Sequence, residues 1–570
     1  MTRDDILEQR KILVHERWKR RMHHLAWYAL LAEVFFLALS PTAATIAMLV
    51  SGVATIARLR IDEDFSFRHL PLDVPAVLFV LLAGASVLVS PDRAFSFYNY
   101  YNLVGAYALT YFLVGQNVRT PQDVRAIFST LAVAAIFVVL YGYYQFAFGI
   151  DIMAMRWVDG NAFPELRKRV FSTWENPNIL AGYLDICICL AFGLLVYAGT
   201  KIKRIVLGIF ILALVVCLSM TYARGALLVM AVILAGYGVL RDWRVLVACL
   251  GIGTLLLALD PVLYERLLSV FTKVDTSTEM RLAFWESTLQ MIQDHPFMGI
   301  GWGAYYLVYP SYDFYMQGAN ILIVHAHNMY LNYMAEIGIP GAAAFFWFFF
   351  GSMGMALRLV FRAPAPKTPE KTPFSYTSAP ADEELQRVEQ TVSQDEEQRI
   401  AWQHDFSRWE DYRFLGGSAL GLGLAFVSVA LNGLTDDLLF NIPSSMFLWM
   451  LAALAAGLCL MHNESYAQQA ELSPSAATTA EDVVPPLASD EAVQDAAVSE
   501  GKNESDKKDS SEAIAEAQGE EVPQEEETEE PGNEHEETLE TENDKMESAE
   551  NALQEVSQDE GASQHIKGDD

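Results

Sequence analysis

The sequence predicts an all-α polytopic membrane protein with about 12 transmembrane helices. Three observations support this class: long apolar runs, basic residues in every second loop, and acidity confined to one end. Of the 570 residues, 52% are hydrophobic, yet the formal net charge is −32. Because a chain cannot be evenly apolar and evenly acidic, the two properties must belong to different segments.

A helix needs about 20 apolar residues to cross the hydrocarbon of a bilayer. Runs of this kind recur along most of the chain, and the two between residues 225 and 259 are short. The predicted transmembrane helices comprise residues 25–40, 42–58, 72–90, 97–115, 124–148, 178–197, 204–221, 225–240, 244–259, 329–358, 414–432 and 440–461.

Basic residues predict the orientation of these helices, since Lys and Arg gather in cytoplasmic loops. Six of them lie between residues 10 and 21, so residues 1–24 are predicted to form a cytoplasmic segment. Every second loop after it is also basic, which places the C-terminus in the cytoplasm as well. The basic residues of these loops are Arg58, Arg60, Arg68, Arg119, Arg125, Lys201, Lys203, Arg204, Arg241, Arg244, Arg358 and Arg362.

Three connections within the predicted membrane domain, residues 25–462, are long. Two of them, 149–177 and 260–328, are outer loops, and the second precedes the tenth helix. The third is a cytoplasmic insertion, 361–413, whose later part around 381–412 is expected to be helical. The other connections are predicted to be tight turns.

Residues 463–570 form an acidic tail, predicted to be cytoplasmic. They hold 33 Asp and Glu against 5 Lys, a charge of −28 that leaves −4 for residues 1–462. A segment so polar and so poor in aromatic residues cannot bury enough apolar surface to fold alone, so it is predicted to be disordered. The tail and the insertion 361–413 are expected to bind cytoplasmic partners. No nucleic-acid partner is predicted.

Most groups able to do chemistry lie in a polar, irregular stretch, residues 260–341. Within it, His325 and His327 come directly before the tenth predicted helix. A neutral histidine at a membrane surface can accept a proton from an attacking hydroxyl group, which suits general-base catalysis. The alternative is an interfacial histidine that only hydrogen-bonds a carbonyl group. His327 is the candidate base, and the role of His325 is left open.

A polar stripe follows these histidines. Asn328, Asn332 and Glu336 are spaced at i, i+4 and i+8, which puts them on one face of a helix. Polar side chains on a membrane helix face protein or water, not lipid. Glu336 lies more than two turns from His327, whereas metal ligands must converge. The sequence therefore predicts no metal and no other cofactor.

Three arginines break the rule that outer loops carry few basic residues. Arg169 and Arg281 lie in the two long outer loops, and Arg224 lies at the outer junction of two short spans. A guanidinium group donates two parallel hydrogen bonds and stays charged, so it suits phosphate oxygens. The three residues are predicted to bind an anionic substrate, and the alternative is contact with lipid headgroups.

Other features of the sequence are less specific. Asp185 lies inside a predicted span, where a carboxylate needs a partner such as Arg224 and has either a structural or a catalytic role. Residues 299–303 are glycine-rich but lack the context of a phosphate-binding loop, so they predict a bend. Residues 338–341 are expected to kink the tenth helix. Asp436 and Asp437, in the last outer turn, are placed near the same site.

These motifs together resemble the O-antigen ligase/polymerase superfamily of bacterial membrane glycosyltransferases. The resemblance spans roughly residues 70–460 and does not include the tail. The parts that carry it are His327-Asn328 followed after nine residues by Gly338-Ile-Pro-Gly341, then Arg169-Val-Phe-Ser-Thr with Asn176-Pro-Asn178, Thr221-Tyr-Ala-Arg224-Gly, and the long loop from Arg281 to Gly303.

The resemblance implies a metal-independent, inverting glycosyl transfer on the outer face of the bacterial cytoplasmic membrane. The donor would be a polyprenyl-diphosphate-linked glycan, and the acceptor a glycan or a lipid. His327 would deprotonate the acceptor hydroxyl group, while Arg169 and Arg224 would hold the diphosphate. Ligase, polymerase and protein-glycosylating versions share these motifs.

Two hypotheses from other classes stay open. One is a transporter or flippase that binds an anionic lipid-linked glycan through the arginines without chemistry. Transporters typically carry internal repeats and binding sites at the middle of the membrane, whereas these polar groups gather at one side. The other is a membrane sensor, for which the sequence contains no recognisable output domain.

Overall fold

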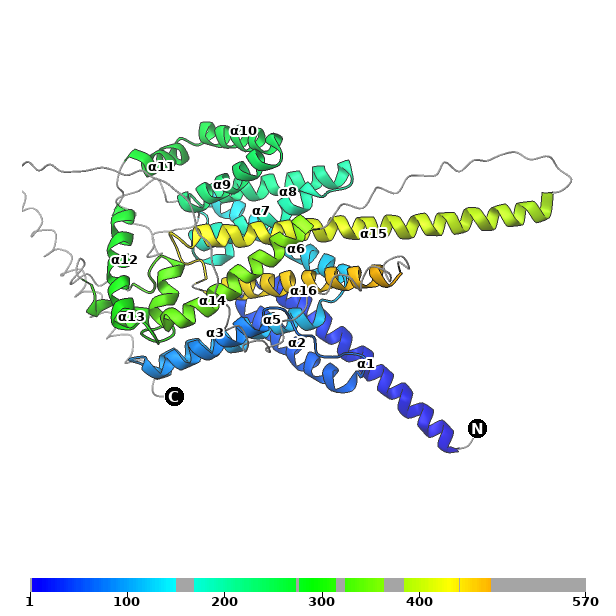
Figure 1. The fold of residues 1–570 in the computed structure, drawn as a ribbon. Coiled ribbons are helices and arrows are strands. Elements are labelled where there is room, and N and C mark those ends of the chain that lie inside the picture. Colours follow the sequence, from blue (N-terminus) through cyan, green and yellow to red (C-terminus); the bar gives the residue numbers. More distant parts are fainter. Residues whose placement is uncertain are drawn as a thin grey trace, which may run out of the picture. The chain divides into compact units, whose positions relative to one another are not determined.

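A computed structural model describes residues 3–149, 169–272, 276–313, 323–362, 384–439 and 441–472. The predictions for residues 473–570 of the acidic tail, for most of the first outer loop and for residues 363–383 of the insertion lie outside this part of the chain. Residues 463–472, predicted to belong to the disordered tail, are helical. Contacts divide the chain into two units, Met1–Val484 and Pro485–Asp570. The described residues all belong to the first unit, and their regular secondary structure is helical (Figure 1).

Helices occupy every apolar run that the sequence singled out. Their caps follow ordinary rules, as at α6, where Thr120 and Asp123 form a capping box ahead of the first turn. The main helices are α1 (Arg3–Phe36), α2 (Pro41–Ile61), α3 (Asp73–Ser86), α4 (Arg93–Asn102), α5 (Leu109–Asn117), α6 (Pro121–Phe148), α7 (Pro177–Val196), α8 (Lys201–Ser219), α9 (Arg224–Leu240), α10 (Trp243–Leu259), α11 (Pro261–Thr272), α12 (Thr276–Asp294), α13 (Tyr305–Val308), α14 (Met329–Arg362), α15 (Glu384–Asn432) and α16 (Ile442–Leu472).

The composition and length of these helices confirm a polytopic membrane protein. Among the described residues, seven helices are long and apolar enough to cross a membrane, or eight if α10 and the start of α11, bent by 112°, form one broken span. Two further apolar helices, Asp73–Val89 and Arg224–Leu240, are shorter. The total of about 12 spans therefore stays a prediction.

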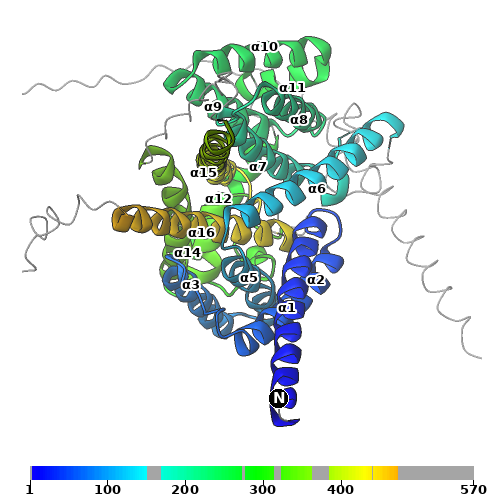
Figure 2. The ribbon, with the colours of Figure 1, turned by 90° about the vertical axis from the view of Figure 1, so that its right-hand side faces the viewer.

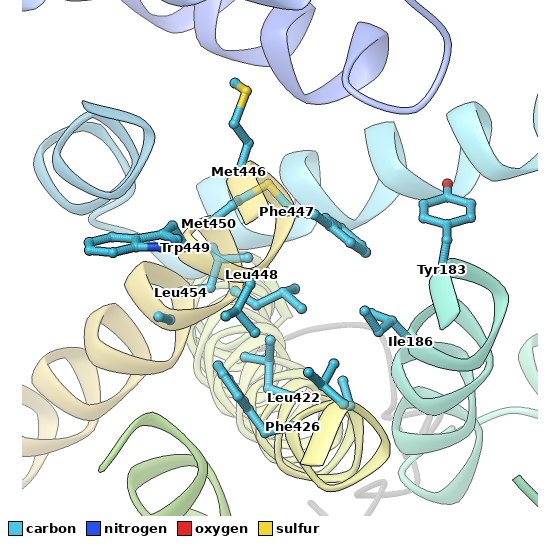
Figure 3. Close-up of a cluster of buried hydrophobic side chains, with 14 of the residues drawn as sticks. Tyr183, Ile186, Leu422, Phe426, Met446, Phe447, Leu448, Trp449, Met450 and Leu454 are labelled. Atoms are coloured by element: carbon cyan, nitrogen blue, oxygen red, sulfur yellow. The ribbon is translucent and has the colours of Figure 1, made fainter. Parts of the chain in front are cut away.

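Helices α7, α15 and α16 form the centre of the first unit. Figure 3 shows side chains of all three meeting, among them Ile186, Phe426 and Phe447. On α7, Gly193 lies so close to the backbone of α15 at Gly417 and Gly421 that a β-carbon would overlap it. In lipid, dispersion contacts and not hydrophobic burial hold helices together. Small residues favour such contacts because they let the two backbones approach closely.

The predicted outer loop 260–328 is largely helical, and the expectation of an irregular stretch was wrong. α11 and α12 follow one another, and α10, α11 and α12 are drawn in green in both ribbon views (Figures 1 and 2). The physical reason is a separate small core in which Phe284 and Met291 of α12 pack against Tyr305 and Tyr309. Apolar side chains at helical spacing bury one face of α12 against the segment that follows it.

Helix α14 breaks at Gly338, whose φ of 70° and ψ of 172° are not helical, so the predicted kink is confirmed. A break frees backbone groups, which must find partners in a membrane. The segment 296–301 supplies them through three hydrogen bonds: Ile300 N to Ala335 O (2.9 Å), Gly301 N to Glu336 O (3.0 Å) and Ile339 N to Pro296 O (2.8 Å). The glycine-rich bend is therefore built against the break.

Replacement of Gly338 by alanine should destabilise the protein. A β-carbon at this position would overlap the carbonyl group of Phe297, and a positive φ strains any residue with a side chain. We expect a loss of about 1–3 kcal/mol, measured as a lower thermal unfolding midpoint in detergent.

Gly354→Ala is the matched control, because Gly354 lies on the same helix with open space at its β-position. It should be neutral or slightly stabilising. Equal midpoints for the two variants would contradict the role assigned to the break.

Candidate functional site

His327 lies just before α14, and its ring is oriented by Asp436. The Nδ1 atom lies 3.1 Å from Asp436 Oδ1, and the two side chains are 33% and 16% exposed. Burial by itself raises the pKa of Asp436. The hydrogen bond with His327, together with the positive charge of Arg281, outweighs burial and holds that pKa below its usual range. An ionised Asp436 can only accept a hydrogen bond, so Nδ1 carries the proton and Nε2 is left as the acceptor.

The hydrogen bonds continue from Asp436 to Arg169. Asn178 Nδ2 donates to Asp436 Oδ2 (3.0 Å), and Arg169 Nη2 donates to Asn178 Oδ1 (2.9 Å). Arg169 Nε also donates to the carbonyl oxygen of Thr221 (2.8 Å). One polar chain thus joins the candidate base to a candidate diphosphate-binding arginine, although 158 positions separate them in the sequence.

His325 holds the backbone of His327. Its Nδ1 atom accepts a hydrogen bond from His327 N (3.1 Å), and His327 has a φ of 47°, in the left-handed region. Burial and the charge of His327 lower the pKa of His325 to about 3, so it is neutral at physiological pH. A strained backbone persists where its surroundings over-determine it. This geometry assigns His325 a positioning contact.

The predicted polar stripe is buried and binds backbone groups around the site. Asn328 Nδ2 donates to Leu434 O (3.0 Å), beside Asp436, and Ala326 N donates to Asn332 Oδ1 (3.1 Å). Gly303 N donates to Glu336 Oε2 (2.9 Å). All three side chains are at most 8% exposed. They fasten the segments on either side of His327 to α14, and Asn328 also caps that helix by accepting from Tyr330 N and Leu331 N.

Arg224, Arg281 and a fourth arginine, Arg266, lie near Arg169 at one end of this chain of hydrogen bonds. Burial, followed by the charges of Arg266 and Arg224, lowers the pKa of Arg169 below its usual value, and Arg281 acts in the same direction. A guanidinium group nonetheless stays protonated in proteins. Sequence analysis overlooked Arg266 because it lies among the apolar residues of α11 and not in a recognisable motif.

Asp185 does not pair with Arg224, so that expectation was wrong. Its Oδ2 atom accepts from Asn432 Nδ2 (3.0 Å) and Ser428 Oγ (3.4 Å), both on α15, and the carboxyl group is fully buried. These partners are neutral and bond only Oδ2, whereas the buried Oδ1 atom has no hydrogen-bond partner among the described residues. We assign Asp185 to helix packing.

Two residues of the chain of hydrogen bonds had weak signals in the sequence. Asp436 was placed near the site without a role, and Asn178 was part of a segment noted only for its arginine. Neither is close in sequence to His327, so no spacing rule links them. The local cues are weak: Asp436 lies four residues after the end of one membrane helix, and Asn178 follows Pro177 at the start of another.

The same residues include a set that could hold a metal ion. Ligand atoms of His325, His327 and Asp436 lie within 4.8 Å of one another, whereas the set weighed from the sequence contained Glu336. Nδ1 of both histidines already takes part in hydrogen bonds, with Asp436 and with the His327 amide. An ion bound through Nδ1 would have to compete with these bonds.

The fold and site define a polytopic α-helical membrane protein with an arginine-rich polar site beside the ends of its helices. Residues 209–346 match the family model described as O-antigen ligase. This segment contains Arg224, Arg281 and His327, whereas Arg169 and Asp436 lie outside it. The match confirms the resemblance to the O-antigen ligase/polymerase superfamily and indicates membrane glycan processing of the O-antigen ligase type. No curated protein matches the chain.

The low pKa of His325 should make stability depend on pH. Between its ordinary value of 6.5 and about 3 in the folded protein, the unfolded chain binds a proton that the native state does not. Stability should therefore fall as pH drops through this window. His325→Asn keeps an acceptor for the His327 amide and removes the titration, so its unfolding midpoint should change less with pH than that of the wild type.

The measurement is thermal unfolding in detergent between about pH 7.5 and pH 4. His295→Asn, a change at an exposed histidine after α12, should keep the wild-type pH dependence. Parallel curves for His325→Asn and the wild type would rule out a buried neutral His325.

Proposed function

We propose that this protein is a membrane glycosyltransferase. It transfers or polymerises a polyprenyl-diphosphate-linked glycan on the outer face of the cytoplasmic membrane, in surface polysaccharide synthesis. The observation that supports this most is the chain of hydrogen bonds Arg169–Asn178–Asp436–His327, which pairs a base with a cation. Glycosyl transfer from a diphosphate needs both.

The chemistry follows from the orientation of His327. Its Nε2 atom takes the proton of an acceptor hydroxyl group as the oxygen attacks the anomeric carbon of the donor sugar. The bond from that carbon to the diphosphate oxygen breaks, and attack from the opposite side inverts the configuration. Asp436 stabilises the imidazolium ion through Nδ1–H, as an aspartate does in a Ser-His-Asp triad.

The leaving diphosphate gains negative charge as the bond breaks. Arg169, Arg224 and Arg281 supply positive charge, and stabilisation of charge that develops in the transition state is usually a large part of catalysis. Because the diphosphate is a good leaving group once neutralised, the mechanism compels no metal. A donor with its lipid in the bilayer and its glycan outside suits a site beside the helix ends.

A transporter for the same lipid-linked glycan is the alternative. It would use the arginines to bind but would not need an oriented base. The His327–Asp436 pair favours the enzyme, since a carboxylate that fixes the tautomer of a histidine serves proton transfer. The motifs do not distinguish ligase, polymerase and protein-glycosylating versions.

His327→Ala should abolish most of the activity. Loss of a general base reduces rate by about 10²–10⁴-fold, measured as initial transfer from a purified lipid-linked glycan to its acceptor in proteoliposomes. Asp436→Asn should have a similar effect, because an amide does not select the same tautomer. Binding of the donor should persist in His327→Ala.

His295→Ala, at an exposed histidine, serves as the control. Full transfer by a folded His327→Ala protein would be incompatible with the proposed mechanism. Movement of the glycan between leaflets without any transfer would favour the transporter.

Chelation should leave transfer unchanged. The proposed base mechanism needs no metal ion, and it uses the Nδ1 atoms of His325 and His327 in hydrogen bonds. We expect the same initial rate before and after dialysis against EDTA, and weak inhibition by added Zn²⁺, which histidine binds well. A loss of rate on dialysis that Zn²⁺ or Mg²⁺ restores would show that the His325–His327–Asp436 set works as a metal site.

A further inference from the structure

The turn formed by residues 221–224 gathers arginines from three parts of the chain. The carbonyl oxygen of Thr221 accepts from Arg169 Nε (2.8 Å), and that of Tyr222 accepts from Arg266 Nη1 (3.2 Å). Arg224 is the first residue of α9 and ends the same turn. The two carbonyl groups belong to adjacent residues, and Arg266 is the charge that acts most strongly on Arg169, so the two guanidinium groups are neighbours.

Tyr222 fixes this turn in a strained conformation. Its φ is 53°, a value that few residues with side chains adopt. Its hydroxyl group donates to Asp260 Oδ2 (2.7 Å), and its ring is buried against Leu263. Strain of this kind persists only where the surroundings hold it, and it is frequent at ligand sites.

Asp260 connects the turn to the start of α11. Its Oδ1 atom accepts from Val262 N and Leu263 N (both 3.1 Å), so it caps the helix on which Arg266 lies. α11 is thus tied to Tyr222 twice, by Asp260 at its start and by Arg266 six residues later. The 112° bend between α10 and α11 lets the chain return to the turn in this way.

Like charges held this close repel one another, and the repulsion is weakly screened where side chains are partly buried. Arg169, Arg224 and Arg266 are each only partly exposed. A ligand with two adjacent phosphate groups would relieve the repulsion and accept several charge-assisted hydrogen bonds. A neutral sugar would do neither.

We propose that Arg266 is a further diphosphate-binding residue, and that Tyr222 and Asp260 are positioning residues that hold it beside Arg169 and Arg224. The proposal rests on the proposed function and adds one residue of α11 to the donor site. The recognised chemistry is a phosphate-bearing anion. The source to which we commit is the diphosphate of the donor, and the headgroup of an anionic phospholipid is the competing source.

Binding of inorganic pyrophosphate to the full-length protein tests this. The protein is placed in nanodiscs of phosphatidylcholine, and the affinity is measured by calorimetry. Arg266→Ala should weaken binding by about 10–100-fold, the range for one hydrogen bond to a charged group, and Arg266→Lys should weaken it less. Arg93→Ala, at an exposed arginine that starts α4, should bind as the wild type does.

A double-mutant cycle tests the positioning residues. Tyr222→Phe removes the bond to Asp260 and should weaken pyrophosphate binding in the wild type, but it should add little loss to Arg266→Ala. A merely structural role would lower the affinity equally in both backgrounds. Such additive losses would overturn the positioning role.

The controls separate this inference from the function on which it rests. If the wild type neither binds pyrophosphate nor transfers glycan, the proposed function fails. If Arg169→Ala and Arg224→Ala lose pyrophosphate binding while Arg266→Ala and Arg266→Lys bind as the wild type does, the inference on Arg266 fails alone. If nanodiscs of phosphatidylglycerol, and not pyrophosphate, raise the unfolding midpoint in an Arg266-dependent way, the residue binds a phospholipid headgroup and the proposal is overturned.

Discussion

A helix that breaks inside an apolar environment leaves peptide groups without partners, and this constraint connects the two halves of the site. At Gly338 the segment 296–301 supplies the missing partners for α14. The chain that leads from Arg281 is therefore fastened to the helix that begins directly after His327. Asn332 and Glu336 add side-chain bonds to the same segments. The candidate base thus sits between two lengths of chain that are already fixed.

The charge of Asp436 links the candidate base to the arginines. Asp436 keeps its charge in spite of burial because His327 and the neighbouring cations stabilise it. That charge orients His327 on one side and, through Asn178, engages Arg169 on the other. The base and the arginines are consequently not independent, and a change of charge at Asp436 is felt by both.

Local composition made much of this architecture predictable. Long apolar runs become helices in a membrane whatever packs beside them, since their backbone must bond internally, and each predicted run is helical. The glycines and proline of residues 338–341 predicted the kink. Arg169, Arg224 and Arg281 were recognisable because predicted outer loops carry few basic residues. The failures have a common cause. Asp185 pairs with Asn432 and not with Arg224, and α12 is helical where an irregular loop was expected. Both outcomes depend on which residues from distant parts of the chain pack against these segments.

The sequence by itself determined the membrane class, the candidate histidine and three of the four arginines, because hydropathy and residue type are properties of short segments. Only the tertiary structure decided which residues meet. Asp436 reaches His327 across 109 positions, and Arg266 meets Tyr222 across 44. Such pairings depend on how helices pack at small residues such as Gly193 and on the bend between α10 and α11. No local pattern predicts these pairings, because the sequence around each residue is compatible with its helix or loop whether or not the distant partner lies beside it.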